Sequence, residues 1–267
     1  MKKLISAPYL LWAAVFIVVP LIMVAYFAFF DNGKFTLEYV SSVAQYSNIF
    51  VRSIWLAAVA TVICLIIAYP IAFILTRMER SYQSTMLMLV MLPMWMNFLL
   101  RTYAWMTLLG NNGVINNFLG FFGLGPFKML NTSGAVVLGM VYNYLPFMIL
   151  PLYTVMEKID VSVLEAAQDL GCNSANTLMR VVLPLSLPGV MSGITMVFVP
   201  AISTFIISRM LGGGGNLLIG DLIEMQFLGN SYNPNLGASI ALVLMVIILL
   251  IMTIMNQFDD DGDRVLM

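Results

Sequence analysis

Residues 53–76 have the sequence SIWLAAVATVICLIIAYPIAFILT, which contains no Asp, Glu, Lys or Arg. A helix needs roughly 20 apolar residues to cross the hydrocarbon core of a bilayer, and this stretch is long enough. Its apolar residues are continuous, whereas a strand of a membrane barrel alternates apolar and polar residues. The stretch therefore predicts a transmembrane helix.

Five other stretches have the same character, and the composition of the whole chain agrees with them. Of the 267 residues, 61% are hydrophobic and 9% are charged, whereas about 25% of a soluble domain is charged. The first stretch is longer than the apolar core of a cleavable signal peptide, so we expect it to be retained. The sequence predicts an all-α polytopic membrane protein, a single domain over 1–267 with six transmembrane helices. The expected spans are 8–30, 53–76, 84–109, 134–156, 187–208 and 237–257.

The distribution of basic residues predicts the orientation of these spans. Six spans place both termini on one side, and cytoplasmic connections carry an excess of Lys and Arg. With cytoplasmic termini, the inner side holds Lys2, Lys3, Arg77, Arg80, Lys158, Arg180 and Arg264, and the outer side holds Lys34, Arg52, Arg101, Lys128 and Arg209. We therefore expect both termini and the connection 157–186 to be cytoplasmic.

The composition also excludes several classes of function. There is no histidine and there are only two cysteines, which argues against a His-ligated metal, a His-dependent catalytic centre and a disulfide scaffold. The net charge of −1 provides no basic surface for nucleic acid. No Gly-Lys-Ser/Thr phosphate-binding motif is present, so the chain has no ATP site of its own. We expect no catalytic residue, no metal and no cofactor in this chain.

The inner connection 157–186 has the sequence signals of two short helices. Ser162 and Glu165 have the spacing of a capping box, and Gly171 is a typical residue just beyond a helix end. Asn173 or Ser174 can cap a second helix. The prolines from Pro184 onward end this helix. Such a stiff protruding element suits docking to a cytoplasmic partner, with Leu164 and Leu170 as candidate anchors.

The same connection resembles the signature of a known family. Glu165-Ala166-Ala167, then Gly171, then Val181-x-Leu183-Pro184 is similar to the EAA motif of binding-protein-dependent ABC importer permeases, with Val181 where isoleucine is usual. The resemblance implies a type I ABC importer transmembrane-domain fold. It also implies that 157–186 is the coupling loop, which sits in a groove of the ATP-hydrolysing subunit. The coupling residues would be Glu165, Ala166, Ala167 and Gly171, together with Leu164 and Leu170.

Other stretches are similar to the permeases of spermidine and putrescine importers, notably 145–153, 157–160 and 215–220. This resemblance implies polyamine transport by alternating access in a bacterial inner membrane. The implied partners are a cytoplasmic ABC ATPase dimer that binds ATP and Mg²⁺, a second homologous permease and an extracytoplasmic solute-binding protein. A permease for another small solute is an alternative. A stand-alone secondary transporter would need ionisable groups in mid-span, which the first, second, fourth and sixth spans lack.

Polar residues within the spans are candidates for the solute path. Asn97, Arg101 and Trp105 are spaced to share one helix face. Either this face lines the pathway, or Arg101 extends to the outer interface and Asn97 bonds a neighbouring helix. Because an arginine repels a cationic polyamine, Arg101 fits a structural or gating role better than that of a ligand.

Two further groups of residues are candidates for contact with a cationic solute. Tyr142 and Tyr144 lie inside the fourth span, and aromatic faces attract ammonium groups by about 0.5–2 kcal/mol. Asp221 and Glu224 are three residues apart in the outer connection that follows the glycine run 212–215. They would receive ammonium groups, dock a binding protein or form a solvated face.

Overall fold

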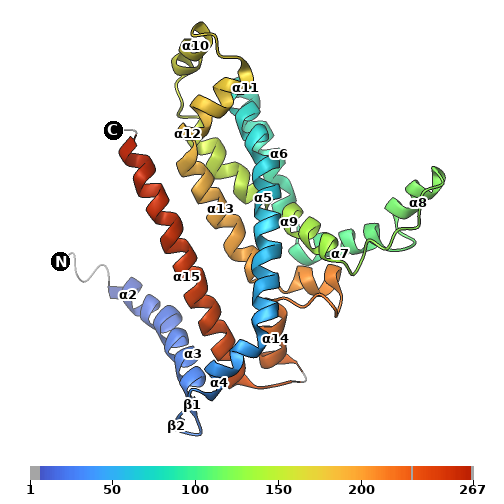
Figure 1. Cartoon of the computed structure of the whole chain (residues 1–267), viewed down its shortest axis with the longest axis vertical. Coiled ribbons are helices and arrows are strands. Elements are labelled where there is room, and N and C mark those ends of the chain that lie inside the picture. Colours follow the sequence, from blue (N-terminus) through green and yellow to red (C-terminus); the bar gives the residue numbers. More distant parts are fainter. Residues whose placement is uncertain (1–6, 230, 266–267) are drawn as a thin grey trace.

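The computed structural model describes residues 7–229 and 231–265, and helices dominate this part of the chain (Figure 1). α10 lies at one end of the long axis, and the short hairpin of β1 and β2 lies at the other. The helices are α2 (Ala7–Ala13), α3 (Val19–Phe29), α4 (Glu38–Ser42), α5 (Ser47–Arg77), α6 (Arg80–Trp95), α7 (Phe98–Leu109), α8 (Val114–Phe121), α9 (Ser133–Met156), α10 (Val161–Asp169), α11 (Ser174–Thr177), α12 (Leu183–Leu185), α13 (Leu187–Ile202), α14 (Ile219–Leu228) and α15 (Pro234–Val265).

Short π- and 3₁₀-helical turns join several of these helices. The π turns are η1 (Ala14–Val18), η3 (Leu178–Val182) and η4 (Ser208–Gly212), and the 3₁₀ turn is η2 (Val43–Tyr46). The strands β1 (Phe30–Asp31) and β2 (Lys34–Phe35) pair antiparallel. Asn32 and Gly33 both have positive φ in the two-residue turn between them, as an Asn-Gly hairpin turn requires.

Four helical segments in the described part of the chain are long and apolar enough to cross a membrane. They are 9–29, 38–77, 133–156 and 234–255, which correspond to the expected first, second, fourth and sixth spans. Two bent pairs of helices also qualify if each pair counts as one span. The structure therefore has the helical character that the sequence predicts, with between four and six such elements.

The expected continuous helix over 84–109 is wrong, because the chain breaks in the middle of it. α6 ends at Trp95, and the helical segment that begins at Phe98 is inclined by 85° to it. Pro93 lies in the last turn of α6, where its ring and its missing N–H oppose continuation of a helix. Asn97 then caps α7, since its side chain accepts from the amides of Leu99 at 2.8 Å and Leu100 at 3.4 Å.

The fifth expected span, 187–208, also differs from the observed helix. α13 ends at Ile202, and the chain forms the separate turn η4 from residue 208. Before α13, the segment Leu178–Leu185 meets it at an angle of 67°. Pro184 and Pro188 flank this corner and account for the break.

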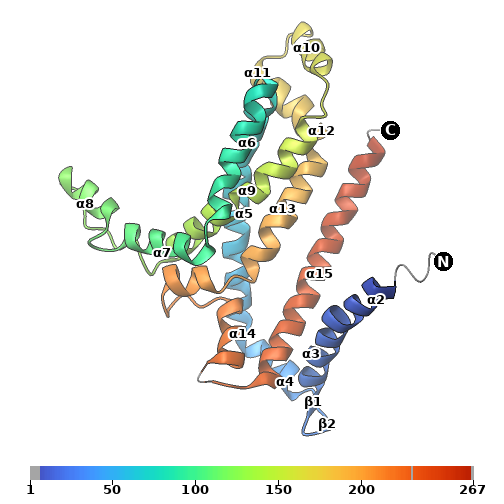
Figure 2. The ribbon, with the colours of Figure 1, turned by 180° about the vertical axis from the view of Figure 1, so that it is seen from behind.

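The core lies where α5, α9 and α13 pack together (Figure 2). One face of α5 carries small, fully buried residues at helical spacing, which allow close approach of a neighbouring helix. These residues are Ala57, Ala60, Cys64, Ala68 and Ala72. On α13, a Cβ at Gly193 would lie 2.6 Å from the sulfur of Met148 on α9, so a larger residue there would displace the Met148 side chain.

Candidate functional site

α10 protrudes beyond the helices of the core at one end of the molecule (Figures 1 and 2). Asp160 begins it as the N-cap, and its carboxylate accepts from the amide of Ser162 at 2.9 Å. This hydrogen bond holds the pKa of Asp160 below its ordinary value. The expected capping box that starts at Ser162 is therefore wrong, because the extended backbone of a cap is found at Asp160.

The end of α10 confirms the role expected for Gly171 as a helix stop. Gly171 has φ of +85°, and its amide bonds to the carbonyl of Gln168 at 2.8 Å. The amide of Cys172 bonds to the carbonyl of Ala167 at 3.0 Å, which completes a Schellman motif. The next turn is capped as expected, since the Asn173 side chain accepts from the amide of Asn176 at 2.8 Å.

The two faces of α10 separate the expected coupling residues into two groups. Leu164 and Ala167 are buried and hold α10 against the rest of the chain. Glu165 and Ala166 are exposed, and Leu170 is 87% exposed. Among the expected anchors, Leu170 is therefore available to a partner, whereas Leu164 is used within the chain.

Arg101, in the first turn of α7, has a buried charged side chain. Its side chain is 7% exposed and its guanidinium lies over the ring of Phe98. Within the described residues, no acceptor lies within hydrogen-bonding distance of its Nε or Nη1. Asn97, at the start of the same helix, is exposed and used as the cap, so the two residues do not form one polar stripe.

Trp105 on α7 contacts Tyr142 on α9, and Tyr144 lies two residues further along α9. The Trp105 and Tyr142 rings meet edge to face with centroids 5.4 Å apart. The structure therefore brings together residues from two separate candidate groups for the solute path. Tyr144 is buried, and its hydroxyl donates to the carbonyl of Pro200 on α13 at 3.3 Å. Tyr142 and Trp105 are partly exposed and keep aromatic surface free.

Asp221 and Glu224 on α14 are both engaged in contacts within the chain. Asp221 is 2% exposed, and its Oδ2 accepts from the amide of Leu218 at 2.9 Å at the start of the helix. Burial raises the pKa of this carboxyl above its ordinary value. Glu224 forms a 2.6 Å ion pair with Arg209. The two carboxylates therefore do not form a joint exposed acidic face.

Sequence reasoning missed a polar network near α14 that involves Arg52 and Asn216. The Asn216 side chain donates to the carbonyls of Gly212 at 2.6 Å and Asn131 at 3.1 Å. Its oxygen accepts from Arg52 and from the Ser133 hydroxyl, and Arg52 also donates to the carbonyl of Gly215. This network fixes the glycine run to α5 and α9. The only sequence signal for it is an arginine at the edge of an apolar span.

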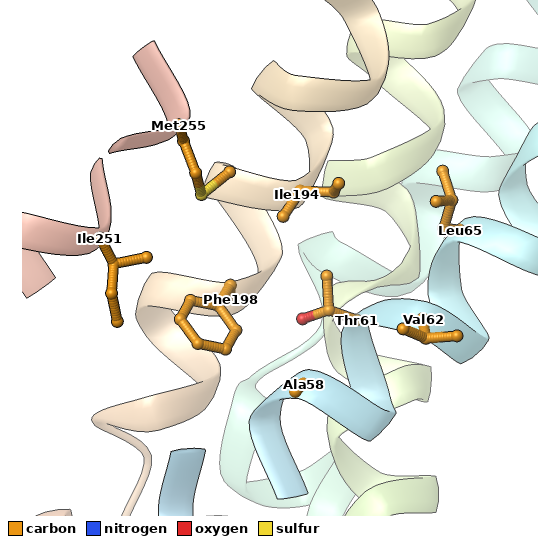
Figure 3. Close-up of a pocket in the computed structure, with 8 residues that line it drawn as sticks. All are labelled: Ala58, Thr61, Val62, Leu65, Ile194, Phe198, Ile251 and Met255. Carbon is orange, nitrogen blue, oxygen red and sulfur yellow. The ribbon is translucent and has the colours of Figure 1, made fainter. Parts of the chain in front are cut away.

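A cavity of about 220 Å³ lies between α5, α13 and α15 (Figure 3). Among the described residues that line it, Thr61 has the one polar side chain, and its hydroxyl donates to the carbonyl of Ala57 at 2.7 Å. This described lining therefore presents no polar group that would hold a charged solute. Its lining consists of Ala58, Thr61, Val62, Leu65, Ile194, Phe198, Ile251 and Met255.

The sequence matches the profile of a protein family over residues 68–260, described as the inner membrane component of binding-protein-dependent transport systems. The chain belongs to this family. The permease is 36% identical to the spermidine/putrescine transport system permease protein PotB of Haemophilus influenzae, over 94% of this chain and 91% of that protein. It is 34% identical to PotB of Escherichia coli, over 88% of this chain and 90% of that protein.

A solved structure supports the same fold for the permease. A chain of a bacterial ABC transporter involved in the import of the acidic polysaccharide alginate superposes with a TM-score of 0.77 at 16% identity, over 97% of this chain and 95% of that chain. The same kind of transporter in complex with an alginate pentasaccharide-bound periplasmic protein gives a TM-score of 0.75. The permease is a helical inner-membrane protein with the fold of ABC importer permeases.

Replacing Gly171 by Ala tests the end of α10. An L-residue in the left-handed region costs about 1 kcal/mol, so we expect Gly171→Ala to lower the free energy of unfolding by about this amount. The measurement is thermal or denaturant unfolding of the purified permease in detergent. Gly120→Ala is the control, because Gly120 lies in α8, has no positive φ and has open space around its Cβ position. Equal loss in both variants would contradict the assignment.

The raised pKa of Asp221 predicts how the stability of the permease depends on pH. Because its pKa is raised in the folded permease, the folded state binds more protons than the unfolded state from about pH 4, the ordinary Asp pKa, up to the raised value. The stability contributed by Asp221 is therefore lost as the pH rises through that window. We expect Asp221→Asn to gain melting temperature relative to the unchanged permease between pH 4.5 and pH 7.5. A constant difference across this range would contradict the assignment.

Proposed function

We propose that the permease forms one half of the membrane pathway of an ATP-driven importer for polyamines such as spermidine and putrescine. The observation that carries this proposal is its likeness to PotB proteins over nearly the whole chain. The permease provides the pathway, and separate cytoplasmic ATPases bind ATP and Mg²⁺. A second homologous permease completes the pathway, and an extracytoplasmic binding protein delivers the solute.

The proposed topology has six spans, and each bent pair of helices counts as one span. α10 then lies in the cytoplasm, and α14 and the hairpin of β1 and β2 lie outside, because they are at opposite ends of the molecule (Figure 1). The carboxyl end of α15 points toward the α10 end, which supports a cytoplasmic C-terminus. Six spans require both termini on one side, so the proposal also includes a cytoplasmic N-terminus.

The proposed ATPase contact is the exposed face of the coupling loop 157–186. Leu170 supplies apolar area at the end of α10, and Glu165 and Ala166 lie on exposed positions beside it. The buried side chains of Leu164 and Ala167 pack against the rest of the chain, and Gly171 ends the helix. When ATP closes the ATPase dimer, the two coupling loops approach each other and the membrane helices change from inward-facing to outward-facing.

The proposed solute path runs past the partly exposed rings of Trp105 and Tyr142. Their faces attract ammonium groups without the strong binding that would trap a polyamine. Arg101 repels such a solute and acts as a structural or gating residue, with Asn97 as the cap of its helix and Tyr144 as a tie to α13. Asp221 and Glu224 support the outer end of the path through their contacts within the chain.

Reconstitution tests the proposed function. The permease is placed in proteoliposomes with the proposed ATPase, second permease and binding protein from the same organism, and uptake of labelled spermidine and putrescine is measured. We expect uptake that requires ATP and the binding protein, with none when a non-hydrolysable ATP analogue replaces ATP. Uptake by the permease alone would indicate a secondary transporter. ATP-driven uptake of another solute, with no polyamine uptake, would refute the polyamine assignment.

Leu170→Glu is the variant that tests the ATPase contact. A charge in place of an apolar anchor at the centre of an interface costs about 2 kcal/mol or more, so we expect retention of the ATPase to be weaker by about 30-fold or more. Co-purification through a tag on the permease gives the measurement. Leu228→Glu is the matched control, because Leu228 is 82% exposed at the end of α14 and outside the coupling loop. Equal retention by the two variants would place the contact elsewhere.

Tyr142→Leu tests the aromatic part of the path. Loss of a cation–π contact of 0.5–2 kcal/mol predicts an apparent KM for spermidine that is higher by about 2- to 30-fold, with assembly unchanged. Tyr103→Leu is the control, because Tyr103 is an exposed tyrosine on α7. An unchanged KM in Tyr142→Leu, or the same rise in both variants, would remove the aromatic path.

A further inference from the structure

The coupling loop is joined to α13 through a buried polar corner at Ser186. Ser186 lies between α12 and α13, where the chain turns by 67°, and it has no exposed surface. Pro184 and Pro188 on either side of it lack the N–H groups that a continuous helix would use. The Ser186 hydroxyl lies 3.2 Å from the carbonyl of Leu183 and donates to it. This corner is the covalent connection between the coupling loop and α13, so a displacement of the loop would reach α13 through it.

Tyr69 on α5 contacts the same corner from a distant part of the sequence. Its hydroxyl oxygen lies 3.0 Å from the Ser186 hydroxyl oxygen. Because the Ser186 proton is directed to Leu183, the Tyr69 hydroxyl donates to Ser186, and a two-step chain of hydrogen bonds results. Tyr69 directly precedes Pro70, which leaves one backbone carbonyl of α5 without its helical partner. The hydrogen bond therefore joins the corner at Ser186 to the turn of α5 that contains Pro70.

A second tyrosine makes the corresponding link on the other side of the coupling loop. Tyr153, three residues before the end of α9, donates its hydroxyl to the side chain of Gln83 at 3.2 Å. Gln83 in turn donates to the carbonyl of Met78 at 2.9 Å, in the corner between α5 and α6. The helices on both sides of the loop, α9 and α13, are thus bonded to the α5–α6 region.

We propose that Tyr69 and Ser186 are positioning residues that transmit displacement of the coupling loop to α5. The proposal rests on the proposed function, in which an ATPase moves this loop. With the bond intact, α13 and α5 move together when the loop moves. Without it, the corner between Pro184 and Pro188 bends independently, and ATP hydrolysis is no longer tightly linked to opening of the pathway.

The test uses Tyr69→Phe in the complete transporter reconstituted with its ATPase, second permease and binding protein. We expect the variant to assemble and to hydrolyse ATP. Stimulation of hydrolysis by solute-loaded binding protein, and the amount of solute imported per ATP, should each fall by about two- to tenfold, the change that loss of one buried hydrogen bond produces in an equilibrium. Ser186→Ala should give a similar loss, and the double variant should lose no more than the larger single loss.

Matched controls separate transmission from a merely structural role. Tyr82→Phe removes an exposed tyrosine hydroxyl on α6. Ser203→Ala removes a serine hydroxyl that, within the described part of the chain, bonds to carbonyls of α13 alone. Both should keep the unchanged ratio of import to hydrolysis. If Tyr69→Phe lowers only the melting temperature and keeps this ratio, the inference is wrong. If the unchanged transporter shows no ATP-driven import, the proposed function fails instead.

A cross-link tests the same inference should Tyr69→Phe fail to assemble. Tyr69→Cys and Ser186→Cys are combined in a permease whose Cys64 and Cys172 are replaced by Ala, and the pair is joined by a bis-methanethiosulfonate reagent about as long as a tyrosine side chain. Because α5 and the corner move together, we expect the joined transporter to import solute at the rate of the unjoined double variant or faster. Loss of import on joining, with recovery on reduction, would show that the two segments separate during the cycle.

Discussion

Backbone polar groups have no water to bond in the hydrocarbon region of a bilayer, and each unsatisfied group costs several kcal/mol. A membrane helix can therefore end or bend only where another group supplies the missing hydrogen bond. Asn97 does so for the first amides of α7, and Asn216 does so for the carbonyls of Gly212 and Asn131. Asn97 and Asn216 are thus both committed to breaks between helices.

This constraint explains which parts of the fold the sequence predicts. Long apolar stretches predict α3, α5, α9 and α15, because only a helix satisfies its own backbone over that length. Hydropathy does not predict the bend between α6 and α7, although Pro93 and the capping residue Asn97 both signal it. Hydropathy remains high across the break, and it does not distinguish a straight helix from two helices that meet at 85°.

In the candidate site, too, the sequence predicts features that depend on neighbouring residues better than contacts between residues far apart in the chain. The sequence predicts the stop at Gly171, because this stop depends on the backbone of one glycine. The sequence also predicts a start at Ser162, whereas Asp160 is the cap. Both residue types are good caps, and the extended backbone at Asp160 decides between them. The pairing of Glu224 with Arg209, and the burial of Asp221, depend on residues brought together by folding, which helical spacing does not show.

The polar contacts between helices have a consequence for how this chain can move. Tyr69–Ser186 joins α5 to α13, Tyr144–Pro200 joins α9 to α13, and Arg52–Ser133 joins α5 to α9. Sliding any one of these helices past the other two would break at least two of these hydrogen bonds and separate the close apolar contact along the alanine face of α5. Moving the three together breaks none of them. In the proposed function, the lowest-cost response to a push on α10 is therefore displacement of the α5–α9–α13 core as one body, so that access to the proposed pathway changes along the outer surfaces of this core.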